Sequence, residues 1–260
     1  MNRLTIIGFL GVAAVLSIGM LMVRTVSLQS VEHDSCISLI AATGHLGDYF
    51  RDAPRNRWVD AAQWQRLLHP DEFGCFGRIT RDLCELDIHP PLYFWLLHLW
   101  IHLAGVSPES GPVLNGILML MTTTVIYRLV RRIGISMVGS MAGAIFLLVN
   151  ASSLETMAVT RQYTLLGLIT AGMVSVAVNA LQTEDIRWYV GLTILASAAF
   201  LTHFQSMVTL MLIAGGVMIS VMHVPSRSVG MMGTCTRRGL VGIAAVGVGI
   251  GLVLLVFPRL

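Results

Sequence analysis

The sequence predicts an all-α polytopic membrane protein with seven transmembrane helices and a large first external loop that carries interfacial helices. Two observations lead to this class. The 260-residue chain is 55% hydrophobic and only 12% charged, with a positive mean hydropathy, which lies outside the range of ordinary soluble domains. Apolar runs long enough to cross a bilayer also recur along the chain. We interpret residues 1–260 as a single transmembrane module.

The net charge of +3 is small, and every basic residue is an arginine. We attribute the excess to arginines that set membrane topology, so the charge does not indicate nucleic-acid binding.

The first predicted span covers about residues 4–23, between Arg3 and Arg24. At 1.5 Å per residue, a helix of this length crosses a bilayer core of about 30 Å. A cleaved signal peptide is the alternative. The run is long for a signal peptide, and Met20–Val23 lacks the small residues of a cleavage site. We therefore predict an uncleaved anchor.

Residues 25–88 form the long polar stretch of the predicted external loop, 25–111. The spacing predicts one short helix over about 34–43, which ends at Gly44, and another over about 60–68, which Asp60 caps. Neither is long enough to span a bilayer, and both could lie on its surface.

Cys75 and Cys84 are neighbours in this polar loop. Outside the cytoplasm, two such cysteines could form a disulfide, and the alternative is two unpaired thiols.

The loop ends at Asp87 and His89, which directly precede Pro90 and Pro91. Proline suits the first turn of a helix, so an aromatic-rich helix is predicted over 91–104. Its aromatic rings favour the level of the lipid headgroups. His98 and His102 lie one turn apart and are interpreted as hydrogen-bonding groups, with a metal-binding pair as the alternative.

Six further spans are predicted, and the arginines orient them. The spans cover about residues 112–131, 135–151, 162–181, 188–203, 204–222 and 239–257. If the helix at 91–104 lies flat in the interface, the arginine clusters of the short loops fall on the same side as Arg3. The positive-inside rule prefers this arrangement, because a spanning helix would invert every later loop. The prediction is a cell (inner) membrane protein with a cytoplasmic N-terminus and a periplasmic or luminal loop 25–111.

Ionisable residues then gather at one depth near the external interface. They are Glu32, His33, Asp34, Asp87, His89, Glu155, Arg161 and His203. Charges at membrane depth are costly and are functional candidates by default. Arg161 is the strongest of them, and its alternative role is a helix-end arginine that extends to the headgroups.

Four segments resemble motifs of one enzyme class. The run from Asp87 through Pro90-Pro91 to Tyr93 is similar to the Asp-x-His-Pro-Pro-Leu-Tyr-Tyr signature of GT-C glycosyltransferases, in particular the family-39 and Rgt-like set, related to protein mannosyltransferases and the aminoarabinose transferase. Three weaker segments agree in order along the chain: the stretch that begins at Asp34, then Glu155 with Arg161-Gln162-Tyr163, and Thr202-His203-Phe204.

The resemblance implies transfer of a sugar from a polyprenyl-phosphate donor to an external glycan, lipid or protein acceptor, by single displacement with inversion. It assigns the general base to Asp34 and the cation that stabilises the departing phosphate to Arg161. Asp87 and His89 would position the phosphate or hold a divalent ion, although no cofactor is required. Tyr163, His203 and Glu155 complete the implied substrate-binding set.

Two departures from the family pattern leave alternatives open. Ser35 replaces an acid that often follows the catalytic aspartate, and the chain is shorter than usual members, which predicts a fragment or a minimal core. Asp34 could instead cap the helix that follows it. The competing functions are a transporter or flippase of lipid-linked sugars and a non-catalytic assembly partner.

Overall fold

A computed structural model describes residues 11, 32–52, 56, 58, 60–70, 72–183, 185–222 and 229–256. These residues contain helices and no strand. The chain divides into two compact units, Met1–Leu165 and Leu166–Leu260. The predicted first span, 4–23, lies outside the described residues apart from Gly11.

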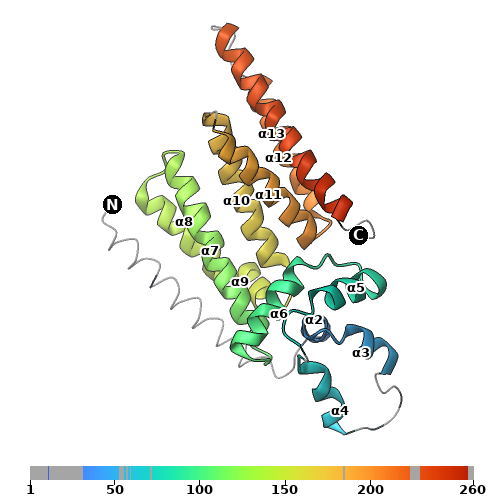
Figure 1. Cartoon of the computed structure of the whole chain (residues 1–260). Coiled ribbons are helices and arrows are strands. Elements are labelled where there is room, and N and C mark those ends of the chain that lie inside the picture. The colour runs from blue at the N-terminus through green and yellow to red at the C-terminus, as the bar shows by residue number, and fades with distance from the viewer. Residues whose placement is uncertain are drawn as a thin grey trace. The chain divides into compact units, whose positions relative to one another are not determined.

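The first unit consists of short helices, one long helix and two further helices that follow it (Figure 1). Its elements are α2 (His33–Thr43), α3 (Leu46–Asp52), α4 (Ala61–Gln65), η1 (Arg66–Leu68), α5 (Phe76–Leu86), α6 (Leu92–Ala104), α7 (Ser110–Arg132), α8 (Met137–Val149) and α9 (Ala151–Ala158). Helix α2 packs against α6, and α7 packs against both α8 and α9.

The second unit is built from long helices. They are α10 (Tyr163–Gln182), whose first turn still belongs to the first unit, α11 (Ile186–Thr202), α12 (Ser206–Met222) and α13 (Val229–Val256). Side-chain hydroxyls join α11 to α13, since Thr193 donates to the Ala245 carbonyl and Ser197 to the Gly249 carbonyl. Helix α13 begins ten residues before the predicted span at 239, because residues 229–238 contain no proline and continue the helix past the apolar run.

The two predicted loop helices are confirmed. Helix α2 ends at Gly44, whose φ of 84° is left-handed, a conformation that glycine adopts without strain. The Asp60 side chain accepts the Ala62 N–H and caps α4, and η1 continues to Leu68. The N-cap of α2 is Glu32, however, so the interpretation of Asp34 as the cap is wrong.

Helix α5 was not predicted, and it determines whether Cys75 and Cys84 can form a disulfide. Its buried residues Ile79 and Leu83 lie one turn apart and pack with Leu46 and Phe94 in a core cluster. Cys75 precedes the helix and Cys84 lies near its end. Nine helical residues separate them by about 13 Å along the axis, well beyond the roughly 7 Å limit for bonded cysteines. The predicted Cys75–Cys84 disulfide is therefore excluded by the helix.

Helix α6 begins after Pro91, as predicted, and buries His98 completely. The His98 Nδ1–H donates to the Ala42 carbonyl at 2.7 Å, and Nε2 accepts the Gly74 N–H at 3.0 Å. Both nitrogens thus have backbone partners, and the accepting nitrogen carries no proton. The hydrogen-bonding interpretation is confirmed for His98, and its metal-binding alternative is wrong.

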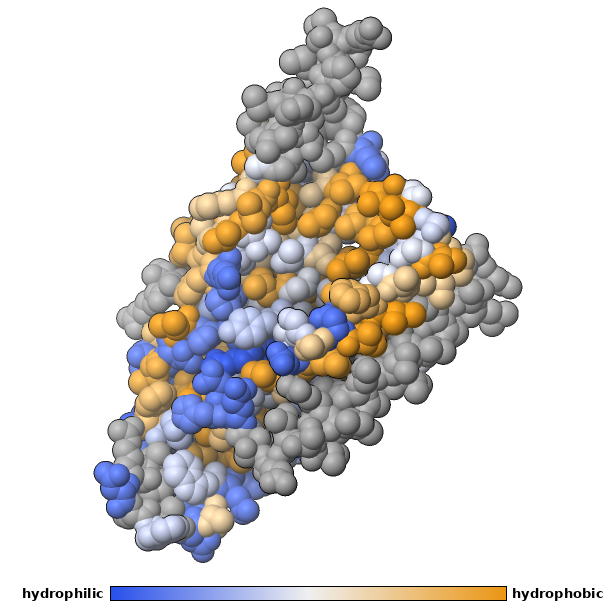
Figure 2. Space-filling view, turned by 180° about the vertical axis from the view of Figure 1, so that it is seen from behind, coloured by the Kyte–Doolittle hydropathy of each residue, from blue (hydrophilic) through white to orange (hydrophobic). Residues whose placement is uncertain are grey.

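Among the described residues, two helices are long and apolar enough to cross a membrane, Ser110–Arg132 and Tyr163–Ala180. A third is added if the bent pair α8 and α9 forms one span. Large apolar side chains such as Val138 and Phe146 are 77% and 70% exposed on α8, and Figure 2 shows broad hydrophobic areas on one face of the molecule. These areas fit contact with lipid. The count of seven spans remains a prediction.

The predicted span at 135–151 ends differently from the expectation. Helix α8 stops at Val149, and α9 continues at an angle of 49° where a loop was predicted. Asn150 makes the bend, since its Nδ2 donates to the Phe146 and Leu147 carbonyls while its Oδ1 accepts the Ser153 N–H. One side chain thus ends the first helix and caps the second.

Candidate active site

The predicted catalytic residues Asp34 and Arg161 are in direct contact. The Arg161 Nη2 lies 2.5 Å from the Asp34 Oδ2. The Arg161 side chain is 11% exposed, while the Asp34 side chain, on the first turn of α2, is 58% exposed. The hydrogen bond and the charge of Arg161 lower the pKa of Asp34, so this carboxylate stays ionised and open to solvent.

A buried hydrogen bond fixes the backbone beside this ion pair. The N–H of Thr160 donates to the Ser35 Oγ at 2.9 Å, and both residues are buried. Ser35 and Thr160 are the chain neighbours of Asp34 and Arg161. The bond therefore holds α2 against the segment that carries the arginine. Ser35, which departs from the family pattern, has this positioning contact in place of an acid.

Asp87 and His89 form a second pair at the entrance to α6. The His89 Nδ1–H donates to the Asp87 Oδ1 at 2.7 Å, and the same oxygen accepts the Ile88 N–H at 2.7 Å. Burial alone would raise the pKa of Asp87, but the bonds from His89 and Ile88 outweigh it and lower the pKa. The charge of Arg161 adds the smallest part of this lowering.

The other predicted site residues lie on or beside three further helices. Glu155 is exposed on α9, and Tyr163 is 47% exposed at the start of α10. His203 lies in the second unit, where its Nδ1 accepts the Gln205 N–H. Their substrate-binding roles stay predictions.

Asp87 and His89, the two residues predicted to hold a divalent ion, lie within hydrogen-bonding distance of each other. Across the residues that the structure describes, no three His, Cys, Asp or Glu side chains gather as metal ligands.

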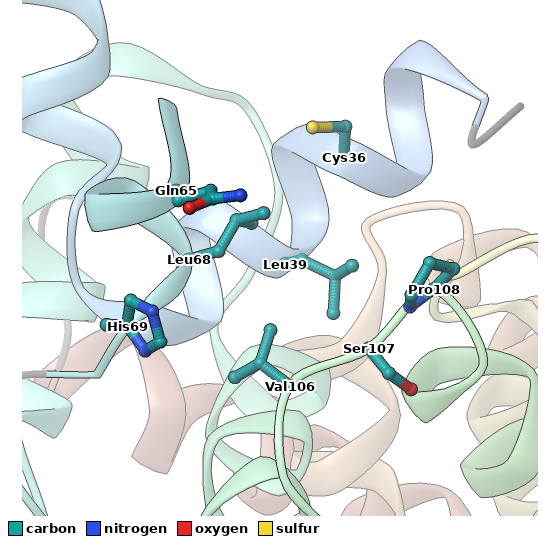
Figure 3. A pocket seen from close by; sticks show the side chains of 8 residues that line it. All are labelled: Cys36, Leu39, Gln65, Leu68, His69, Val106, Ser107 and Pro108. Atoms are coloured by element: carbon teal, nitrogen blue, oxygen red, sulfur yellow. The ribbon is translucent and has the colours of Figure 1, made fainter. Parts of the chain in front are cut away.

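A separate cavity of about 220 Å³ opens on α2 (Figure 3). It is mostly apolar, and Figure 3 shows Cys36 and Leu39 from α2 facing Leu68 and Val106 across it. Cys36 follows Asp34 by two positions, which is a turn of about 200° on a helix. The cavity therefore lies on a different face of α2 from the ion pair.

Gly111 of α7 packs closely against Thr160, the residue that precedes Arg161. A Cβ on Gly111 of α7 would lie 2.6 Å from the Thr160 Cβ and would overlap the rest of that β-branched side chain. We expect Gly111→Ala to displace the Thr160–Arg161 segment, to destabilise the fold by about 1–3 kcal/mol and to reduce any sugar transfer about 100-fold. Thermal unfolding in detergent and a transfer assay measure the two effects.

Gly143→Ala on α8 is the matched control, because its Cβ would meet no atom within 4 Å. Unchanged transfer by Gly111→Ala would show that this close approach does not fix the position of Arg161.

The chain is similar to one family of known proteins. Residues 88–248 match the family model described as dolichyl-phosphate-mannose-protein mannosyltransferase, which is more than half of the 260-residue chain. The match includes His89 and Arg161 but begins after Asp34 and Asp87. No curated protein and no solved structure gives a significant match. The chain belongs to the dolichyl-phosphate-mannose-protein mannosyltransferase family, which implies a membrane glycosyltransferase of the GT-C type.

Proposed function

We propose that this protein transfers a sugar from a polyprenyl-phosphate donor to a hydroxyl acceptor on the external face of the membrane. The observation that supports the proposal is the contact of Asp34 with Arg161, two residues that lie far apart in the chain. A base and a cation thus meet, and Asp87 orients the imidazole of His89, in a chain of a glycosyltransferase family.

In the proposed reaction, the acceptor oxygen attacks the anomeric carbon while its proton passes to Asp34. The bond from that carbon to the phosphate oxygen breaks, and polyprenyl phosphate leaves with the electron pair. Attack opposite to the leaving group inverts the anomeric configuration. Arg161 stabilises the negative charge that develops on the phosphate.

The ion pair of Asp34 and Arg161 affects the order in which donor and acceptor would bind. In the free protein, Arg161 bonds Asp34 and weakens it as a base by lowering its pKa. A donor phosphate would compete for the same guanidinium, and Asp34 would then regain basicity as the acceptor arrives. We therefore propose that the donor binds before the acceptor.

The test uses the purified full chain in lipid nanodiscs with dolichyl-phosphate [14C]mannose and a panel of hydroxyl acceptors. Radiolabel in an acceptor, with release of dolichyl phosphate, supports the proposal. Absence of product with this donor and with other polyprenyl-phosphate sugars would reject it.

The Asp87–His89 pair predicts a smaller but specific effect. Asp87 holds the proton of His89 on Nδ1. Asp87→Asn would therefore hold the ring less firmly and would no longer select this tautomer. We expect transfer to fall about 10- to 100-fold, the usual effect of losing a residue that orients a functional histidine. Initial rates at saturating donor measure it.

Asp82→Asn is the control for this variant. Asp82 accepts the Gly47 N–H through Oδ2, and an amide oxygen can still accept this bond, so transfer should not change. Equal rates in the two variants would remove Asp87 from the site.

A further inference from the structure

Asn115 of α7 is completely buried and makes three hydrogen bonds. Its Oδ1 accepts from the Tyr93 hydroxyl at 3.1 Å and from the Thr164 hydroxyl at 2.8 Å. Its Nδ2 donates to the Val159 carbonyl at 2.6 Å. The carbonyl can only accept, which fixes the orientation of the amide, so both hydroxyls must donate to the oxygen.

The partners of Asn115 lie on both sides of Arg161 in the sequence. Val159 precedes the arginine by two positions and Thr164 follows it by three, so one side chain holds both ends of this short segment. Tyr93 links the amide to α6, four residues after His89. The segment that carries the arginine is therefore fixed from α6 and α7 as well as from α2.

Tyr93 is suited to a fixed donor role. Its side chain is completely buried, and burial raises the pKa of its hydroxyl, so the proton stays in place at any physiological pH.

We infer that Asn115, held by Tyr93, is a positioning residue that presents Arg161 to the phosphate of the donor. Neither residue touches substrate in this account. They act by holding the backbone on both sides of the arginine. The inference rests on the proposed role of Arg161, and it adds two residues to which the family resemblance assigns no function.

The inference predicts that Asn115 matters only while Arg161 is present. We expect Asn115→Leu to weaken the binding of dolichyl phosphate about tenfold in the otherwise native chain. In an Arg161→Gln background, the same change should weaken binding less than about twofold, because no guanidinium remains to be positioned. Binding of dolichyl phosphate to the full chain in nanodiscs measures all four affinities.

Asn115→Leu leaves its buried partners unpaired and could disturb the fold. The same four measurements are therefore repeated with Tyr93→Phe, which is a smaller change. It removes one hydroxyl and keeps the shape of the ring, and binding should weaken a few-fold, again only with Arg161 present. Tyr189→Phe is the matched control, since that buried hydroxyl donates to the Ala180 carbonyl within the second unit.

The outcomes separate this inference from the proposed function. Equal losses of affinity with and without Arg161, or no loss in its presence, would overturn the positioning role alone. Unchanged binding in Arg161→Gln itself would overturn the proposed phosphate site, and the positioning role with it.

Discussion

Asp34→Asn is expected to reduce sugar transfer about 1000-fold, because an amide cannot accept the proton of the attacking hydroxyl. The fold should persist, since the side chain is 58% exposed and an amide oxygen can still accept the bond from Arg161. Transfer of labelled mannose and thermal unfolding in detergent are measured on the same preparation. A large loss of rate with an unchanged unfolding temperature would identify Asp34 as the base.

Asp60→Asn is the matched control for this variant. Asp60 is also an acid of the first loop and caps α4, and asparagine caps helices equally well. We expect normal transfer from it. Full activity of Asp34→Asn would contradict the assignment of the base and leave the pairing with Arg161 as a structural contact.

Arg161→Gln is expected to have the second largest effect. Transfer should fall about 100- to 1000-fold, because the charge that develops on the departing phosphate loses its cation. The pH dependence should change as well. Arg161 lowers the pKa of Asp34, so its removal raises that pKa toward the ordinary value for aspartate. A base acts only when deprotonated, and the acidic limb of kcat/KM, which reports the free protein, should therefore move to higher pH.

Arg187→Gln serves as the control, because Arg187 also pairs with an aspartate, Asp185, but is 85% exposed. Its transfer rate and pH profile should equal those of the native chain. A normal rate for Arg161→Gln would leave the arginine as a headgroup contact, and an unmoved acidic limb would show that Asp34 is not the titrating base.

Local signals in the sequence predicted three helix ends. Gly44 ends α2 through its left-handed backbone, Asp60 caps α4, and Pro91 precedes α6. Helix α5 was missed although Ile79 and Leu83 carry the one-turn spacing, because charged residues surround them. The bend at Asn150 was missed because the hydropathy of α8 gives no sign of an amide that caps the next helix.

The candidate site also contains residues that could be predicted from the sequence and residues that could not. Its charged members, Asp34 and Arg161, could be selected by residue type and family resemblance. The positioning contacts could not be predicted: Tyr93 stands in the family signature and Ser35 departs from the family pattern, but nothing in the sequence pairs Ser35 with Thr160 or Tyr93 with Asn115. Their bonds join segments far apart in the chain, and no local pattern in a single sequence records such pairings.

The most direct test of the central claim is product analysis with the purified chain in sealed vesicles that contain dolichyl-phosphate [14C]mannose. The account predicts a new glycosidic bond of inverted anomeric configuration on an acceptor supplied at the external face, together with released dolichyl phosphate. Movement of the intact donor between leaflets without any new bond would contradict it and identify a flippase, and product formed only from the cytoplasmic face would contradict the external site.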